Sequence, residues 1–146
     1  MGRLARLLVA LAVALALPWA SAAQESPSFD AADRAAIQAL IADQIAAFGR
    51  DDGAAAYALA APGIQDLFPT VEAFMAMVRG GYEPVYRPQA VAFGTLVESS
   101  RGPVQPVFVT GPDGGRYVAI YLLERQPDGA WLIAGCTLGR DTRPAI

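Results

Sequence analysis

The segment Thr70-Val-Glu-Ala-Phe-Met-Ala-Met-Val-Arg-Gly-Gly-Tyr-Glu-Pro-Val-Tyr-Arg-Pro88 joins a half of the chain with helical periodicity to a half with the periodicity of strands. Thr70 is a predicted N-cap, and Gly80-Gly81 is predicted to end the helix that follows it, with Gly80 as a left-handed cap. Two prolines, Pro84 and Pro88, then predict extended backbone, because proline and its restricted predecessor disfavour a helix. We therefore expect the chain to turn from helix to sheet within this segment.

The chain before this segment is predicted to be helical. Apolar residues at spacings of three and four indicate a first helix that is capped by Asp30. Gln44 lies on its apolar face, so we expect an inward side chain that finds a backbone partner, a water or a ligand. Asp51 and Asp52 are expected to cap a second, alanine-rich helix, and a short third helix should begin at Pro62.

The chain after this segment has a period of two, which is typical of half-buried strands. The turn sequences Gly-Pro-Asp-Gly-Gly and Gln-Pro-Asp-Gly separate the last three predicted strands. Pro106 argues for an edge position or a bulge in its strand. The predicted fold is α+β, with N-terminal helices packed on an antiparallel sheet of about four strands, at residues 89–97, 104–110, 116–125 and 130–138.

The first 23 residues have the pattern of a Sec-type signal peptide. A short basic segment precedes an apolar run of 11 residues, Leu7 to Leu17, whereas a membrane-spanning helix needs roughly 20. Small residues follow this run, and we expect cleavage after Ala22 or Ala23. Residues 24–146 then form a single domain that is periplasmic or secreted, and no membrane contact is expected after cleavage.

Composition excludes several classes of chemistry. The chain contains no His, no Lys and a single Cys, which excludes His-dependent nucleophilic sites, His or Cys zinc sites and lysine Schiff bases. After cleavage, 9 Arg stand against 14 acidic residues, and the net charge of −5 makes nucleic acid an unsuitable partner. Cys136 is the single cysteine and sits in an apolar strand, where a small buried hydrophobe is expected. We predict no metal site and no cofactor.

Three segments carry a resemblance: Gln44-Ile-Ala-Ala-Phe48, Gly81-Tyr-Glu-Pro-Val-Tyr-Arg-Pro88 and Gln126-Pro-Asp-Gly-Ala-Trp-Leu-Ile-Ala-Gly-Cys136. Together they resemble a bacterial family catalogued as domain of unknown function 4864, and the second segment is the most specific. That family in turn resembles the nuclear-transport-factor-2-like (NTF2-like) superfamily, which includes SnoaL-like and ketosteroid-isomerase-like proteins. The resemblance implies a cone in which a curved antiparallel sheet wraps a long first helix and leaves an apolar pocket. It implies no activity, because one fold hosts many functions.

Three functional hypotheses follow. The first is an exported, non-catalytic domain that binds a small apolar or amphipathic molecule through Gln44, Tyr82, Tyr86 and Arg87. Arg87 could instead pair with a loop carboxylate, and the two tyrosines could simply pack at the rim of the pocket. The second is an enzyme of ketosteroid-isomerase or dehydratase type that uses a carboxylate and a tyrosine, although no catalytic residue is assigned. The third is homodimerisation through the sheet, because the strand at residues 116–125 is apolar on both faces.

Overall fold

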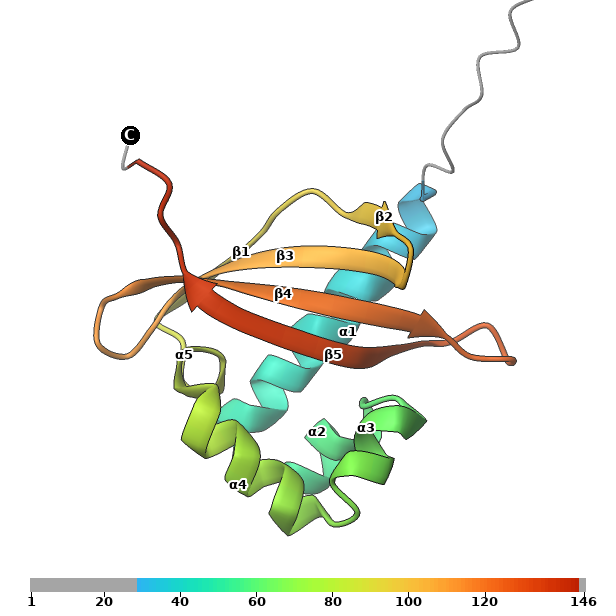
Figure 1. Ribbon diagram of the computed structural model, residues 1–146, viewed down its shortest axis with the longest axis horizontal. Helices are drawn as coiled ribbons and strands as arrows, with labels where there is room; N and C mark the ends of the chain where they lie inside the picture. Colours follow the sequence, from blue (N-terminus) through green and yellow to red (C-terminus); the bar gives the residue numbers. More distant parts are fainter. Residues whose placement is uncertain (1–28, 145–146) are drawn as a thin grey trace, which may run out of the picture.

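The computed structural model describes residues 29–144, and the predicted signal peptide at residues 1–23 lies outside them (Figure 1). In the described chain the helices come first and the strands follow, which confirms the predicted α+β fold. The helices are α1 (Ala31–Gly49), α2 (Gly53–Ala58), α3 (Pro62–Leu67), α4 (Val71–Gly81) and α5 (Glu83–Tyr86). The strands are β1 (Ala90–Phe93), β2 (Val97–Ser99), β3 (Gly102–Thr110), β4 (Arg116–Arg125) and β5 (Trp131–Arg140).

The sheet is antiparallel throughout, with the strand order β1-β3-β4-β5 and with β2 paired to the other end of β3. It has five strands within the described residues rather than the predicted four, because the predicted strand at residues 89–97 splits into β1 and β2. The splitting of this strand creates a break in the ladder beside β3. β3 pairs with β1 and β2 on one side and with β4 on the other, so the edge position offered for Pro106 is wrong. The alternative, a bulge, agrees with the register, in which residues 94–96 lie opposite residues 105–106.

The break between β1 and β2 has a local cause. The Gly94 N–H donates to the Pro106 carbonyl at 2.8 Å, and Nε2 of Gln105 donates to the Gly94 carbonyl, also at 2.8 Å. Pro106 has no N–H of its own to offer the neighbouring strand. A regular ladder would therefore gain no bond from Pro106 at this point, and the buried Gln105 amide takes the place of a backbone donor.

α1 crosses one face of the sheet, and the shorter helices gather around its C-terminal half (Figure 1). The Asp30 carboxylate caps α1, as predicted, by accepting from the Asp33 N–H at 2.7 Å. The N-terminal part of α1 packs on the inner face of the sheet. We name the buried apolar residues around this contact the sheet-side cluster. Its buried members are Ile37, Leu40, Ile41, Ile45, Val85, Leu96, Val107, Val109, Ala119, Tyr121, Leu123 and Ile133.

A second apolar cluster lies where the end of α1 meets α2 and α4. We name it the helix-side cluster, and its buried members are Ala47, Phe48, Ala56, Ala60, Phe74, Met75 and Val78. Aromatic contacts hold it together: the ring centroids of Phe48 and Phe74 are 6.2 Å apart, and those of Tyr57 and Phe74 are 5.4 Å apart. α1 thus belongs to both clusters and connects the sheet to the shorter helices.

α4 begins as predicted and ends differently. Thr70 is its N-cap and accepts a hydrogen bond from the Ala73 N–H at 3.1 Å. Gly80 and Gly81 do not stop the helix: both lie inside α4, and neither has a positive φ. The predicted left-handed cap at the first glycine is therefore wrong, and Tyr82 follows the last helical residue.

The segment after Tyr82 is helical rather than extended. α5 begins at Glu83, with Pro84 in its first turn. Proline is tolerated there because the first N–H groups of a helix have no intrahelical partner. The predicted extended backbone is therefore wrong for this segment, and the chain reaches β1 only after one turn of helix.

Two features are absent from the described residues. None of the helices between residues 29 and 144 combines the length and the apolar character needed to cross a membrane. The same residues contain no group of three or more His, Cys, Asp or Glu side chains that could hold a metal ion.

Candidate functional site

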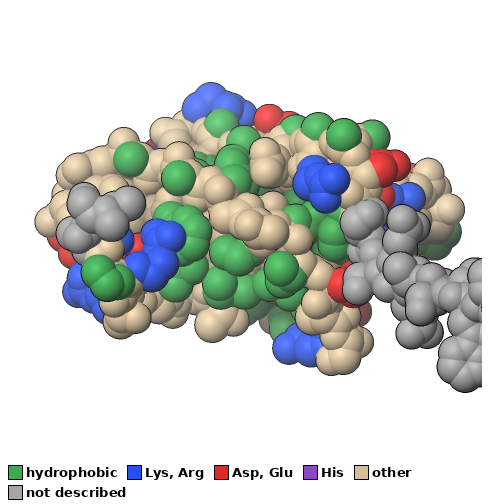
Figure 2. Space-filling model, turned by 90° about the horizontal axis from the view of Figure 1, so that it is seen from above, with side chains coloured by type: hydrophobic (Ala, Val, Ile, Leu, Met, Phe, Trp, Pro, Cys, Tyr) green, Lys and Arg blue, Asp and Glu red, His purple; other side chains and the backbone are tan. Residues whose placement is uncertain are grey.

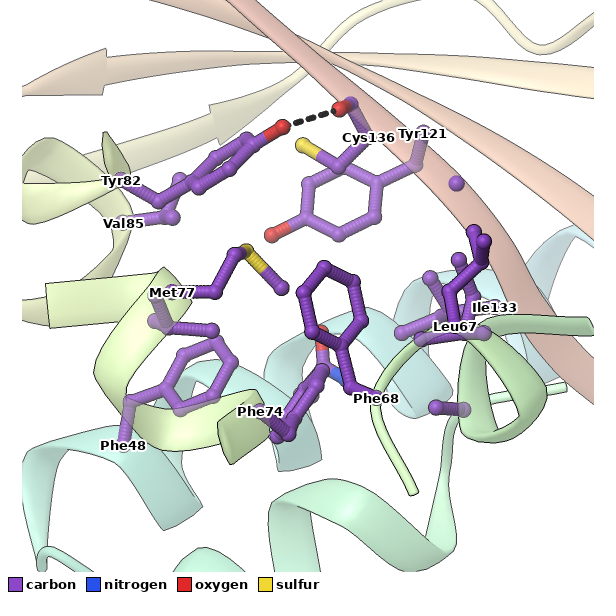
Figure 3. A pocket seen from close by; sticks show the side chains of 15 residues that line it. Phe48, Leu67, Phe68, Phe74, Met77, Tyr82, Val85, Tyr121, Ile133 and Cys136 are labelled. Carbon is purple, nitrogen blue, oxygen red and sulfur yellow. Dashed lines mark hydrogen bonds between the residues drawn. The ribbon is translucent and has the colours of Figure 1, made fainter. Parts of the chain in front are cut away.

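A cavity of about 290 Å³ lies between the two apolar clusters, and members of both line it (Figure 3). The helices supply one side of its wall, and β4 and β5 supply the other. No charged side chain is among the lining residues of the described chain, which are Gln44, Phe48, Ala60, Ile64, Leu67, Phe68, Phe74, Met77, Val78, Tyr82, Val85, Tyr121, Ile133, Gly135 and Cys136. A molecule held here would meet apolar walls and very few polar groups.

Gln44 points inward from α1, as its place on the apolar face predicts. Its side chain is 4% exposed and lines the cavity. Its Nε2 donates to the carbonyl of Ala56 at 3.2 Å, so the backbone partner that the sequence leaves open is present. This bond links α1 to α2, and Gln44 therefore has a structural role in addition to its place in the cavity wall.

Tyr82 spans the distance from the joint between α4 and α5 to the last strand of the sheet. Its hydroxyl donates to the carbonyl of Cys136 at 2.9 Å, the bond drawn as a dashed line in Figure 3. Burial raises the pKa of Tyr82, and the neighbouring Cys136 raises it further. The phenol is therefore a neutral hydrogen-bond donor at pH 7, and it ties the helical joint to β5 beside the cavity.

Tyr121 is the largest fully buried side chain among the described residues, at 1% exposed. It projects from β4, and its hydroxyl points into the cavity toward Met77 (Figure 3). Burial raises the pKa of Tyr121 well above its ordinary value, and burial raises the pKa of the adjacent Cys136 thiol to about 12. Both groups are uncharged at neutral pH, so Cys136 is a poor nucleophile.

Tyr86 and Arg87 do not line the cavity but form a surface cluster with Asp51 and Arg79. Nη2 of Arg87 lies 2.9 Å from Oδ2 of Asp51, and Nη1 of Arg87 donates to the Phe48 carbonyl at 2.6 Å. The Tyr86 hydroxyl also donates to Asp51, and the Arg87 guanidinium lies 4.2 Å from the centre of the Tyr86 ring. Arg87 thus makes the loop-carboxylate pair that the sequence offers as an alternative to ligand binding.

The two aspartates after α1 have different roles. Asp52 caps α2, as predicted, by accepting from the Ala55 N–H at 3.1 Å. Asp51 instead has a φ of 56° and ends α1 in the left-handed conformation. Its N–H donates to the Phe48 carbonyl at 3.0 Å, and that of Asp52 donates to the Ala47 carbonyl at 2.9 Å, which is the Schellman pattern. The prediction that both aspartates cap α2 is therefore correct for Asp52 alone.

The structure brings two of the four predicted binding residues, Gln44 and Tyr82, to the cavity and places Tyr86 and Arg87 in the surface cluster. Sequence reasoning missed Tyr121 as a site residue. A signal for it exists: Tyr121 alternates with its neighbours in step with the apolar Leu123, so its ring faces the core. A tyrosine in such a position needs a partner for its hydroxyl, which marks it as a polar group inside an apolar site.

Comparison with known proteins gives one match. No curated protein and no solved structure matches the chain. The family described as "Domain of unknown function (DUF4864)" matches residues 30–146, a span that begins at the N-cap of α1 and contains every residue lining the cavity. The chain therefore belongs to the DUF4864 family.

Proposed function

We propose that this protein is a non-catalytic domain that binds a small apolar molecule in the cavity between its two clusters. The observation that carries the proposal is a cavity of about 290 Å³ with no charged side chain among its described lining residues. Ligand pockets are mostly apolar with few polar groups, and their volumes begin at roughly 300 Å³. At ~30 Å³ per water molecule, the cavity holds about ten water volumes. This size suits a ligand with on the order of ten non-hydrogen atoms.

We propose further that the fold is a form of the NTF2-like cone. This is supported by α1, a 19-residue helix that packs on the inner face of an antiparallel sheet. It is also supported by the position of the cavity, which α1 and the sheet border together. Both features are those that the resemblance implies for a ligand-holding cone.

An enzyme that acts through a carboxylate and a tyrosine has less support. Such an enzyme needs an acid within hydrogen-bond reach of its substrate. None of the cavity-lining side chains within residues 29–144 is Asp or Glu, although Tyr82 and Tyr121 are present. The cavity therefore offers donors for binding but no carboxylate base for proton abstraction.

The proposed binding is tested by filling the cavity. Met77 lines it from α4, whereas its neighbour Ala76 is exposed, so Met77→Trp and Ala76→Trp place the same side chain inside and outside. Toluene, a small apolar probe, should bind the wild type and Ala76→Trp and should bind Met77→Trp at least tenfold more weakly. NMR titration measures the affinities, and native mass spectrometry of the purified protein reports any bound molecule. Equal toluene binding by all three proteins would contradict the proposal.

Export to the periplasm or the exterior is part of this proposal and rests on the sequence of residues 1–23. The test is to express the full chain with a C-terminal tag and to fractionate the cells. The tagged protein should be shortened by 22 or 23 residues and should leave the cytoplasm, and replacement of the apolar run by polar residues should retain it there.

A second candidate function is self-association through the outer face of the sheet. Side chains of β3 and β4 that alternate with the buried ones are apolar and half-buried, and we name them the outer face: Val104, Pro106, Phe108, Val118, Ile120 and Leu122. Seen from above, on the side where β2 and β3 lie in Figure 1, hydrophobic side chains gather in the middle of the visible face (Figure 2). A sheet with one face in water normally carries polar residues there, so this composition favours a second protein surface.

A further inference from the structure

The walls of the cavity select against ions. No Arg, Asp or Glu is among its described lining residues, and the phenols of Tyr82 and Tyr121 stay protonated at neutral pH. An ion that entered would lose its hydration without gaining an opposite charge. A ligand of this cavity is therefore uncharged.

The aromatic side chains in the walls favour a ligand that contains a ring. Phe48, Phe68, Phe74 and Tyr121 contribute aromatic rings, and Met77 contributes a thioether (Figure 3). Aromatic rings favour stacked and edge-to-face contacts with another ring, and a thioether packs well against a ring edge. With about ten water volumes at ~30 Å³ each, the cavity has room for one six-membered ring with a short substituent.

One hydroxyl group in the wall is available to such a ligand. The amide nitrogen of Gln44 is bound to the Ala56 carbonyl, and the Tyr82 hydroxyl is bound to the Cys136 carbonyl. The Tyr121 hydroxyl points into the cavity, and Figure 3 marks no hydrogen bond between it and another lining residue. This buried donor therefore gains from an oxygen acceptor on a ligand.

We infer that the cavity takes an uncharged compound with one six-membered ring and one carbonyl-type oxygen, which accepts a hydrogen bond from the Tyr121 hydroxyl. This inference rests on the proposed function, because it names the class of molecule that the same cavity holds. The ring lies among the phenylalanines and Met77, and the oxygen faces β4.

The experiment compares three probes of similar size: acetophenone carries the carbonyl, ethylbenzene lacks it, and benzoate is charged. Their Kd values are measured by NMR titration for the wild type, Tyr121→Phe and Tyr117→Phe. Tyr117 lies on the same strand, but its hydroxyl is bound to Asp113 outside the cavity, which makes it a matched control. Because ethylbenzene is the more hydrophobic probe, the informative quantity is the ratio of the acetophenone Kd to the ethylbenzene Kd.

We expect Tyr121→Phe to raise this ratio about fivefold and Tyr117→Phe to leave it unchanged, since one neutral hydrogen bond is removed. Benzoate should bind at least tenfold more weakly than acetophenone to the wild type. A measurement on the wild type alone serves as a second test: the infrared carbonyl stretch of bound acetophenone should lie at lower wavenumber than in hexane. This readout keeps the inference testable if Tyr121→Phe fails to fold.

The outcomes separate the inference from the proposed function. If acetophenone and ethylbenzene bind but the ratio is the same in all three proteins, and the carbonyl stretch is that seen in hexane, the inference is wrong and the proposed function stands. Benzoate binding as tight as that of acetophenone overturns the uncharged class. If none of the probes binds the wild type at millimolar concentration, both the proposed function and the inference fall.

Discussion

Among single residues, Asp51 combines an unfavourable backbone conformation with an exposed ion pair. Its φ of 56° lies in the left-handed region, which costs a non-glycine residue roughly 1–2 kcal/mol. Its carboxylate pairs with Arg87, but the two side chains are 53% and 38% exposed, so the pair contributes at most about 1 kcal/mol. The cost of the backbone conformation is therefore larger than the contribution of this ion pair, to which the hydrogen bond from the Tyr86 hydroxyl adds. Substitutions at this position separate the backbone cost from the side-chain contacts.

We predict that Asp51→Gly leaves the free energy of unfolding within about 1 kcal/mol of the wild type, because relief of the backbone conformation offsets loss of the pair. Asp51→Ala loses the pair without that relief and should be about 1 kcal/mol less stable than Asp51→Gly. Urea unfolding followed by circular dichroism measures both differences. If the alanine and glycine variants are equally stable, the backbone conformation is not the dominant cost.

Cys136 gives a prediction with a defined pH window. Its pKa rises from an ordinary 9.0 to about 12 in the folded protein, because the thiol is buried. Between these values the folded state keeps a proton that the unfolded state has lost, so the free energy of unfolding falls as pH rises. The thiol contributes a slope of at most about 1.4 kcal/mol per pH unit.

We therefore expect Cys136→Ala to lose less stability than the wild type between pH 9 and pH 11, as measured by urea unfolding at each pH. Burial, the larger cause of the raised pKa values of Tyr82 and Tyr121, acts in both proteins, and Cys136 adds to both shifts. The difference between the two curves therefore reports the thiol together with its effect on these two tyrosines. Identical pH dependence of the wild type and the variant would contradict the predicted role of burial.

At the scale of elements, the end of α4 is the clearest departure from the sequence pattern. Gly80 lies inside the helix without a positive φ, and a Cβ built on it would meet no atom within 4 Å. Gly129, in the hairpin before β5, has equally open surroundings but a φ of 88°. The two glycines differ in backbone conformation and not in available space, which makes them a matched pair.

We predict that Gly80→Ala raises the free energy of unfolding by about 0.5–1 kcal/mol, because alanine has the higher helix propensity. Gly129→Ala should lower it by about 1–2 kcal/mol, since alanine disfavours a positive φ. Thermal and urea unfolding of both variants measure the two signs. A destabilised Gly80→Ala variant would instead support the left-handed cap that the sequence pattern favours.

Sequence patterns predict the elements best where the cause is local. The caps Asp30, Asp52 and Thr70 were all predictable, because each carboxylate or hydroxyl satisfies an N–H three residues further on. The break between β1 and β2 depends instead on Gln105 of another strand, which donates to the Gly94 carbonyl. No pattern within residues 89–97 contains that information, so the predicted single strand is a consequence of reading each segment alone.

For the whole molecule, the cavity results from the way two clusters meet, and this could not be read from the sequence. Periodicity correctly predicted that Gln44 points inward, but it could not show that the side chain would bond to Ala56 of α2. Tyr86 and Arg87 are close in sequence to Tyr82 and still lie outside the cavity, because α5 turns them toward Asp51. Predicting the site therefore required the arrangement of α1, α4 and β5 together. Only the inward orientation of Gln44 could be predicted from the local sequence of α1.

The outer face of the sheet gives a prediction for the assembled protein. Ile120 lies near the middle of β4, opposite Pro106 of β3 in the register, and both side chains are half-buried and apolar. If two copies associate through this face, a charge at Ile120 would be buried without a partner, which is strongly unfavourable. Ala46 is exposed on α1, away from the sheet, and offers a control position for the same substitution.

We expect the wild type and Ala46→Glu to form a dimer at micromolar concentration and Ile120→Glu to be monomeric, with an unchanged circular dichroism spectrum. Size-exclusion chromatography with light scattering measures the masses over a hundredfold range of concentration. Because the cavity lies on the other face of the sheet, toluene should bind the monomeric variant as it binds the wild type. A wild type that is monomeric throughout this range would reject the dimer, and the ligand-binding proposal would be unaffected because it depends on a different face.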